Sequence, residues 1–237
     1  MILAHPNEGF LTAATLAKCI DHTVLAPDHS VEDVEQACEE AIAYGFATVT
    51  VAPYDVARAA VRLAGSGVAV GGTVGIPLGH SGLRGKMAEA LTCVDAGADE
   101  VDMVVNLMAA KSHLWGDVRN EIAAIRLITD GRILKVILEC CYLTDEEKVR
   151  VSEIAVEAGA DFVKTSTGFG PGGATVADVT LLKQTVGRQA QIKAAGGIRT
   201  FAKAWAMIQA GATRLGTSTG AAIIHDFHET RAAAHHG

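Results

Sequence analysis

The sequence predicts a closed (β/α)8 barrel, the TIM-barrel class of α/β folds, preceded by one extra N-terminal helix. Short apolar segments alternate with helical patterns along the 237 residues, and such alternation is typical of a parallel sheet. Eight of these pairs follow one another at a spacing of roughly 25–30 residues, which suits a barrel of this length. EAGADFVK, DAGADEVD and QAGATRLG each lead from a helix end into a strand, which supports internal periodicity. An open, doubly wound sheet of similar content is the alternative.

The elements are expected in regular order along a single domain spanning residues 1–237, with frayed ends at 1–10 and 229–237. A helix at 11–18 precedes the first strand and is placed to cover one end of the barrel. The strands are expected at 19–25, 46–51, 68–76, 100–106, 134–139, 161–166, 190–196 and 213–218. The helices that follow them are expected at 31–44, 54–64, 82–96, 115–129, 145–158, 176–186, 201–210 and 220–228.

Local signals support these boundaries. In the helix at 31–44, apolar residues recur at the three- and four-residue intervals of one helical face, and Ser30 precedes it as an N-cap. Glycines end this helix and three later ones, at Gly45, Gly97, Gly159 and Gly211. Apolar, β-branched runs such as FATVTV and LKVILE lie between the helices and are typical of buried strands.

Composition and charge narrow the class of protein. Apolar residues make up 49% of the chain, which suffices for a large core. The formal net charge of −7 argues against nucleic acid or an anionic membrane as the main partner. No apolar run approaches the ~20 residues of a membrane span. Five cysteines without a C-x-x-C pair, and a start unlike a signal peptide, lead us to expect reduced thiols and a cytoplasmic protein.

Ionisable residues inside the predicted strands give the first indication of function. Lys164 lies in the segment DFVKTS and Lys193 in AQIKAAG, although a charged lysine is costly to bury. Side-chain alternation allows both to point inward, together with Asp102 of EVDMVVN. Because chemistry in these barrels takes place at the carboxyl ends of the strands, we expect the three side chains to meet there.

Two lysines beside one carboxylate are suited to imine chemistry. An amine attacks a carbonyl only when it is unprotonated, and a lysine ordinarily has a pKa near 10.4. Burial and a second ammonium group disfavour the charged form, and a shift of ~3 units corresponds to roughly 4–5 kcal/mol. The carboxylate can then move protons to and from the intermediates, directly or through water. The alternative is a structural ion network in which Asp102 only pairs with the lysines.

Glycine loops after the seventh and eighth strands indicate a phosphate site. KAAGGIRT and RLGTSTG stand where barrels of this class bind phosphate with backbone N–H groups and a helix N-terminus. Gly196 and Gly197 permit close approach of the backbone, and Ser218 and Thr219 offer hydroxyl groups at the start of a helix.

Other polar residues receive no functional role. Lys135 and Glu139 could equally be charges at the rim, and His22 is expected to be a hydrogen-bonded core histidine. His225 and His228 offer too few ligands for a metal site, so no metal is expected.

Several stretches together resemble the deoxyribose-phosphate aldolases, a family of class I aldolases. They are IDHTVLAP (20–27), GIPLGH (75–80), GADEVDMVVN (97–106), LKVILECCYLTDEE (134–147), ADFVKTSTGFGPGGAT (160–175), IKAAGGIRT (192–200) and GATRLGTSTG (211–220). They follow one another in the family's order, and VKTSTGF together with KAAGGIRT is highly specific. The resemblance implies a (β/α)8 barrel that reversibly cleaves 2-deoxy-D-ribose 5-phosphate to acetaldehyde and D-glyceraldehyde 3-phosphate in deoxyribonucleoside catabolism.

The resemblance also implies roles for individual residues, and it implies no metal or organic cofactor. Lys164 would form the Schiff base, Lys193 would perturb it, and Asp102 would relay protons. The residues expected at the phosphate or elsewhere on the substrate are Gly196, Gly197, Arg199, Ser218, Thr219, Asp21 and Thr167.

The expected partners are small molecules, a phosphosugar and aldehydes, and the expected assembly is a homodimer or a higher homo-oligomer. Two other functions stay open: another Schiff-base barrel aldolase with a different aldehyde acceptor, and a catalytically silent phosphosugar-binding barrel. Three positions depart from the usual family pattern, namely Ala26, Thr50 and Ile76. They bear on substrate range and aldehyde tolerance rather than on the reaction class.

Overall fold

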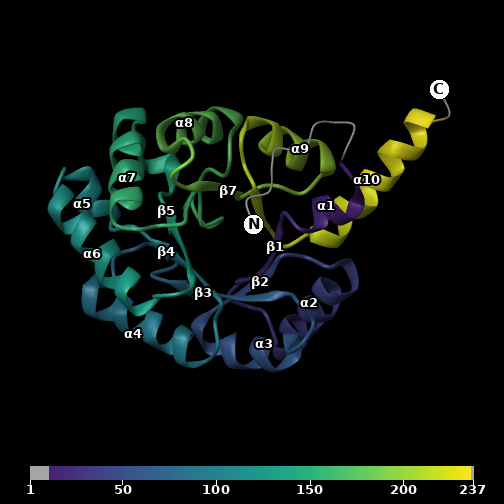
Figure 1. Ribbon diagram of the computed structural model, residues 1–237, viewed down its shortest axis with the longest axis horizontal. Coiled ribbons are helices and arrows are strands. Elements are labelled where there is room, and N and C mark those ends of the chain that lie inside the picture. The colour runs from purple at the N-terminus through teal and green to yellow at the C-terminus, as the bar shows by residue number, and fades with distance from the viewer. Residues whose placement is uncertain (1–10, 236–237) are drawn as a thin grey trace.

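The strands close into a barrel in which each strand pairs with the next in chain order and the eighth pairs back to the first (Figure 1). All of these pairings are parallel. The computed structural model of the protein describes residues 11–235, so the expected frayed segment at 1–10 lies outside this range. Helices surround the barrel (Figure 1). The predicted (β/α)8 fold is confirmed, and the open doubly wound sheet is wrong.

The strands are short and lie close to the predicted segments. Their bounds are β1 (Ile20–Val24), β2 (Thr48–Val51), β3 (Ala69–Val74), β4 (Glu100–Val104), β5 (Ile133–Ile137), β6 (Phe162–Lys164), β7 (Gln191–Ala195) and β8 (Arg214–Thr217). The predictions ran too far at the carboxyl ends. Asn106 and Glu139, both predicted in strands, instead lie in the loops that follow them.

The longer helices follow the strands as predicted. They are α2 (Val31–Tyr44), α3 (Val56–Leu63), α4 (Gly82–Asp95), α6 (Trp115–Ile128), α7 (Asp145–Glu157), α8 (Val176–Val186), α9 (Phe201–Ala210) and α10 (Gly220–His235). The short 3₁₀ turn η2 (Pro53–Asp55) begins the helix predicted at 54–64. Two other short elements were not predicted, α5 (Leu107–Lys111) and η3 (Cys140–Tyr142), because neither is long enough to show a helical period.

Helix α2 has the predicted bounds because local chemistry fixes both of its ends. Ser30 and Asp33 form a reciprocal capping box at its start. Gly45 ends it in the left-handed conformation, with φ of 70°. The helix buries Val34, Ala37, Cys38 and Ala41 against the barrel.

The first and last helices of the chain pack against each other. The helix predicted to cover one end of the barrel, α1 (Ala13–Ala17), packs against α10 (Figure 1). Arg231 of α10 donates a hydrogen bond to the Leu11 carbonyl at 3.1 Å. Helix α10 continues past its predicted end at His228 to His235. Within residues 11–235, none of the helices has both the length and the apolar character needed to cross a membrane.

The apolar core lies between the barrel and its helices, whereas the inside of the barrel is polar. In β4, Val101 and Met103 join the apolar core, and Asp102 between them points inward. The buried charged or polar residues of the strands include Asp21, Thr48, Glu100, Asp102, Lys135, Lys164, Lys193 and Arg214. Buried charges are costly unless they are paired, so their partners define the interior of this barrel.

Candidate active site

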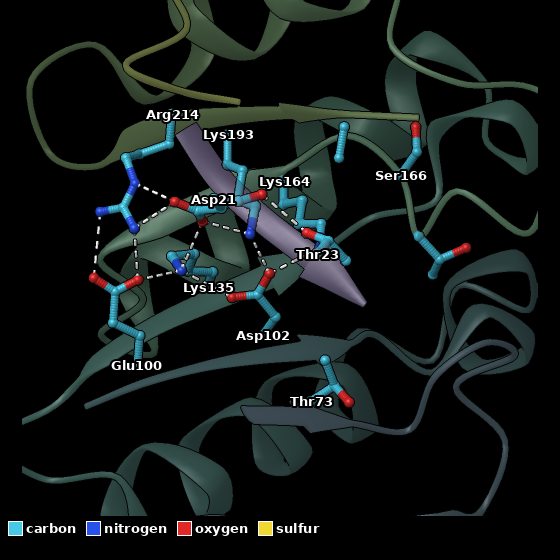
Figure 2. A network of polar contacts seen from close by, with 12 residues as sticks. Asp21, Thr23, Thr73, Glu100, Asp102, Lys135, Lys164, Ser166, Lys193 and Arg214 are labelled. Carbon is cyan, nitrogen blue, oxygen red and sulfur yellow. Dashed lines mark hydrogen bonds and ion pairs between the residues drawn. The ribbon is translucent and has the colours of Figure 1, made fainter. Parts of the chain in front are cut away.

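Asp102 lies at the centre of a cluster of lysines inside the barrel (Figure 2). Its Oδ2 accepts hydrogen bonds from Lys164 Nζ at 2.8 Å and from Lys193 Nζ at 2.7 Å. Its Oδ1 accepts one from Lys135 Nζ at 3.0 Å. Strand register places Asp102 beside Lys135, and Lys164 beside Lys193, two residues further along the barrel strands. The structure thus brings together the three predicted catalytic residues and adds a third lysine.

A second carboxylate, Asp21 of β1, lies behind Lys193. It is 2.5 Å from Lys193 Nζ and 3.1 Å from Lys135 Nζ, and Arg214 of β8 donates to its Oδ1. Asp21 is fully buried and does not line the cavity described below. Its position therefore gives no support to the expected contact with substrate.

Glu100 extends the cluster away from the carboxyl ends of the strands. Arg214 donates to it through two nitrogens, at 3.2 and 2.9 Å, and Lys135 Nζ lies 2.5 Å from its Oε2. Thr48 donates its hydroxyl to the same oxygen at 3.1 Å. Lys135, for which a rim position was one interpretation, is thus fully buried at the centre of the barrel.

Four cations face three carboxylates in this cluster. The cations are Lys135, Lys164, Lys193 and Arg214, and the carboxylates are Asp21, Glu100 and Asp102. An excess positive charge is costly in a buried site, and an arginine keeps its proton. The cluster therefore favours the loss of one proton from a lysine.

Lys193 is the lysine of this cluster whose pKa is lowered. Burial lowers the pKa of Lys193 to about 8; Asp102 and Asp21 oppose the shift, whereas Lys135 and Lys164 add to it. Lys135 behaves in the opposite way, because the nearby carboxylates outweigh its burial and raise its pKa. From the sequence we expected Lys193 to perturb Lys164; the pKa that is lowered is instead that of Lys193, and Lys164 is among the charges that lower it.

Asp102 is held in its ionised form. Burial alone would raise its pKa, but the ammonium groups of Lys135, Lys164 and Lys193 outweigh burial and hold the pKa of Asp102 well below its usual range. Asp102 therefore acts as a fixed negative charge that positions the lysines around it.

A cavity of about 590 Å³ opens beside this cluster, with walls from the ends of β1, β6, β7 and β8 and the loops after them. Of the three lysines, only Lys164 lines it. Lys135 and Lys193 are fully buried behind it. Thr167, three residues after Lys164, lines the same cavity. A molecule in the cavity thus meets one amine of the cluster and not the other two.

Four of the predicted phosphate residues line this cavity, namely Gly196, Gly197, Arg199 and Ser218. Gly196 and Gly197 have φ of 90° and 73°, a left-handed conformation that favours glycine. Thr219 does not line it. The Thr219 backbone N–H donates to Thr217 Oγ1 at 3.1 Å, and the two hydroxyls are also 3.1 Å apart. Thr219 therefore shapes the turn before α10 instead of facing the cavity.

One of the two ring nitrogens of the buried residue His22 has a polar partner. Its Nε2 lies 3.1 Å from a Glu40 carboxylate oxygen, and its ring is 5.3 Å from that of Phe46. Its buried Nδ1 has no hydrogen-bond partner among residues 11–235. Burial lowers the pKa of His22, against the influence of Glu40. The expectation of a hydrogen-bonded histidine is thus confirmed for one ring nitrogen, and His22 also lines the cavity.

Glu139 is likewise buried and not at the rim. It is 1% exposed, and its carboxylate accepts hydrogen bonds from the backbone and the hydroxyl of Thr167. The sequence contains no pattern that pairs these two residues. The only available signal was an acidic residue at the carboxyl end of a predicted strand.

Comparisons with known proteins agree with this site. The model of the DeoC/LacD family of aldolases matches residues 15–226. The deoxyribose-phosphate aldolase of Carboxydothermus hydrogenoformans is 48% identical over 218 residues, which cover 90% of this chain and 96% of that protein. That of Brevibacillus brevis is 50% identical over 207 residues, covering 87% and 94%.

A solved structure agrees as well. The deoxyribose-phosphate aldolase of Aeropyrum pernix, described as having a unique tetrameric structure, superposes with a TM-score of 0.87 at 32% identity, covering 92% of this chain and 93% of that one. The resemblance inferred from the motifs is confirmed, and the chain belongs to the DeoC/LacD family of aldolases.

Proposed function

We propose that the protein is a class I aldolase that reversibly cleaves 2-deoxy-D-ribose 5-phosphate to acetaldehyde and D-glyceraldehyde 3-phosphate, within the catabolism of deoxyribonucleosides. The observation that carries the proposal is the position of Lys164. It is the one lysine of the buried cluster that lines the cavity, and it lies 2.8 Å from the ionised carboxylate of Asp102. The names of the relatives supply the substrate class.

The reaction begins when the neutral amine of Lys164 attacks C1 of the open-chain sugar. Loss of water from the resulting carbinolamine gives an iminium ion, which withdraws electrons from the C2–C3 bond. That bond breaks as the C3 hydroxyl loses its proton, so C3 becomes the aldehyde carbon of glyceraldehyde 3-phosphate. The enamine left on Lys164 takes up a proton at C2, and water then releases acetaldehyde.

Lys193 supplies the exchangeable proton in this scheme. A group with a pKa of about 8 exists in both protonation states near neutral pH, which suits repeated proton transfer. Lys193 and Lys164 both donate to Asp102 Oδ2, so the exchangeable proton of Lys193 lies within one hydrogen-bonded chain of the nucleophilic amine. Asp102 Oδ2 lies between the two amines, and a proton that passes between them crosses this carboxylate, in keeping with the relay role expected of Asp102. Lys193 acts in this indirect way because it does not itself reach the cavity.

The phosphate is proposed to bind the glycine loops after β7 and β8. Gly196 and Gly197 leave their backbone open to a close approach, and Arg199 and Ser218 offer a charge and a hydroxyl in the same cavity. This part of the proposal separates the two aldolase functions. An aldolase for non-phosphorylated aldehydes would have no use for this binding site.

The test compares 2-deoxyribose 5-phosphate with 2-deoxyribose in an assay of released acetaldehyde. We expect kcat/KM to be at least ~100-fold higher for the phosphorylated sugar, because two or more charge-assisted hydrogen bonds contribute about 1.5–3 kcal/mol each. Equal turnover of the two sugars would favour the aldolase with a different acceptor. No cleavage of either sugar would leave the silent phosphosugar-binding barrel.

We also infer a homo-oligomer, with a homodimer as the first candidate, and a cytoplasmic location. The relative from Aeropyrum pernix is described as a tetramer, which supports an assembly of some kind. All five cysteines are free thiols, as expected for a reducing compartment. Light scattering after size-exclusion chromatography would measure the assembly directly.

A further inference from the structure

Glu139 occupies an unusual position at the carboxyl end of β5. Its backbone is left-handed, with φ of 53° and ψ of 63°, a conformation that costs roughly 1–2 kcal/mol for a residue other than glycine. Hydrogen bonds hold the chain on both sides of it. The Leu138 N–H donates to the Lys164 carbonyl at 2.9 Å, and the Cys140 N–H donates to the Thr165 carbonyl at 2.8 Å. The loop after β5 is thereby fixed to the loop after β6.

This conformation directs the Glu139 side chain at Thr167. The Thr167 N–H donates to both carboxylate oxygens, at 3.2 Å each, and the Thr167 hydroxyl donates to Oε2. The contact is close and enclosed. A Cβ placed on Gly170 would lie 3.3 Å from the carboxylate, so the glycine loop packs directly on it. The Cys141 thiol lies 4.0 Å from Oε1, and the charge of Lys164 also acts on this carboxylate.

The contact decides what Thr167 can offer to the cavity. A threonine hydroxyl has one donor proton and two acceptor lone pairs. The proton is taken by Glu139, and one lone pair accepts the Phe169 N–H at 3.1 Å. One lone pair is left, and Thr167 lines the cavity. The hydroxyl therefore has no proton to donate and can only accept a hydrogen bond from a molecule in the cavity.

A hydroxyl group on the substrate is the matching partner, because it can donate to that lone pair. The acceptor aldehyde of the proposed reaction carries one hydroxyl, at C2 of glyceraldehyde 3-phosphate. This aldehyde must extend from the Lys164 amine towards the loops at Gly196 and Ser218. Thr167 lies in that cavity, three residues beyond Lys164.

We propose that Glu139 is a positioning residue that makes Thr167 an obligate hydrogen-bond acceptor and thereby selects acceptor aldehydes with a hydroxyl on the carbon next to the aldehyde. The inference rests on the proposed function, since it concerns the second substrate of that reaction. It adds a residue that does not line the cavity and that acts on the acceptor through its hydrogen bonds to Thr167.

The test measures addition of acetaldehyde to two acceptors, D-glyceraldehyde 3-phosphate and 3-oxopropyl phosphate, which lacks the hydroxyl. The quantity compared is the ratio of kcat/KM for the two acceptors. Glu139→Gln keeps the size of the side chain but places an amide where the Thr167 N–H and hydroxyl need acceptors. We expect the ratio to fall about threefold to tenfold, the effect of one hydrogen bond between two neutral hydroxyl groups. Glu153→Gln, on the exposed surface of α7, makes the same chemical change and should leave the ratio unchanged.

Thr167→Val and the double variant show whether Glu139 acts through the hydroxyl. Thr167→Val should lower the ratio to a similar extent, and E139Q combined with T167V should lower it little further. A purely structural brace would lower kcat/KM for both acceptors alike, and that result overturns the inference, as does an unchanged ratio. If E139Q does not fold, Glu139→Asp takes its place, because aspartate tolerates a positive φ but is too short to reach Thr167. The ratio must fall in that variant too.

Borohydride trapping with acetaldehyde separates this inference from the proposed function. E139Q should form the reduced adduct as fully as the unmodified protein, because Glu139 interacts with Lys164 only through its charge and makes no hydrogen bond or ion pair with it. If the unmodified protein forms no adduct, the proposed function fails. If it does and E139Q does not, Glu139 acts on the first half-reaction and the inference about the acceptor is overturned.

Discussion

Lys193→Leu tests the excess charge in the barrel most sharply. Leucine retains much of the lysine stem, and every carboxylate keeps a partner: Asp21 retains Lys135 at 3.1 Å, and Asp102 retains Lys135 at 3.0 Å and Lys164 at 2.8 Å. The variant cluster then contains three cations and three carboxylates. Because these charges balance, none of the remaining lysines has to lose its proton to relieve an excess of positive charge. The variant should therefore fold, but the excess charge that favours deprotonation of an amine should be gone.

The magnitude follows from the pKa of about 8 at Lys193. At pH 7, a lysine with that pKa is neutral in about one molecule in ten, so Lys193 can both give and take up a proton. Leucine can do neither, and we expect kcat/KM at pH 7 to fall by about 10²–10⁴-fold, the usual effect of removing a proton-transfer group.

A pH profile of kcat/KM from pH 6 to 10 shows whether Lys193 sets the pH dependence. The sign follows from the pKa of Lys193: its ammonium form is lost as the pH rises through about 8, which removes the excess positive charge of the cluster and favours attack by a neutral amine. In the unmodified protein kcat/KM should therefore rise through pH 8, and in Lys193→Leu this rise near pH 8 should be absent. A rise near pH 8 that persists in the variant would refute the charge argument. Circular dichroism of the variant controls for folding.

Two further predictions concern the other lysines. Lys135→Met leaves Glu100 with Arg214 as its one cationic partner in the cluster and takes one partner each from Asp21 and Asp102. We therefore expect urea denaturation to show a loss of about 3–5 kcal/mol in the free energy of unfolding. A loss below about 1 kcal/mol would contradict the central role of this lysine. Lys164→Ala should abolish cleavage. Its midpoint of urea denaturation should stay close to that of the unmodified protein, because Asp102 keeps Lys135 and Lys193 as partners. A cleavage rate within tenfold of the original would count against Lys164 as the nucleophile.

The fold and the centre of the site were accessible from the sequence because both depend on local periodicity. Alternation along a strand assigns Asp102, Lys164 and Lys193 to the inside, and parallel register then brings Lys164 level with Lys193. Helix α2 could be predicted to its last residue because Ser30 and Gly45 mark its ends.

Contacts across the barrel could not be predicted in the same way. Lys135 of β5 reaches Asp21 of β1 only because the sheet closes with a particular stagger, which no single strand encodes. Glu139 was placed in a strand because a positive φ in a residue other than glycine leaves no mark in the sequence. Thr219 was assigned to the phosphate by its place in the loop, although its hydroxyl faces Thr217.

The central claim is that the cavity exposes one nucleophilic amine among three buried lysines. Incubation with acetaldehyde and borohydride, followed by digestion and mass spectrometry of the peptides, locates that amine directly. The account predicts one reduced ethyl group, on Lys164, and no such adduct in Lys164→Ala. An adduct on Lys193 or Lys135, or an unmodified Lys164 in a protein that still cleaves deoxyribose 5-phosphate, would contradict it.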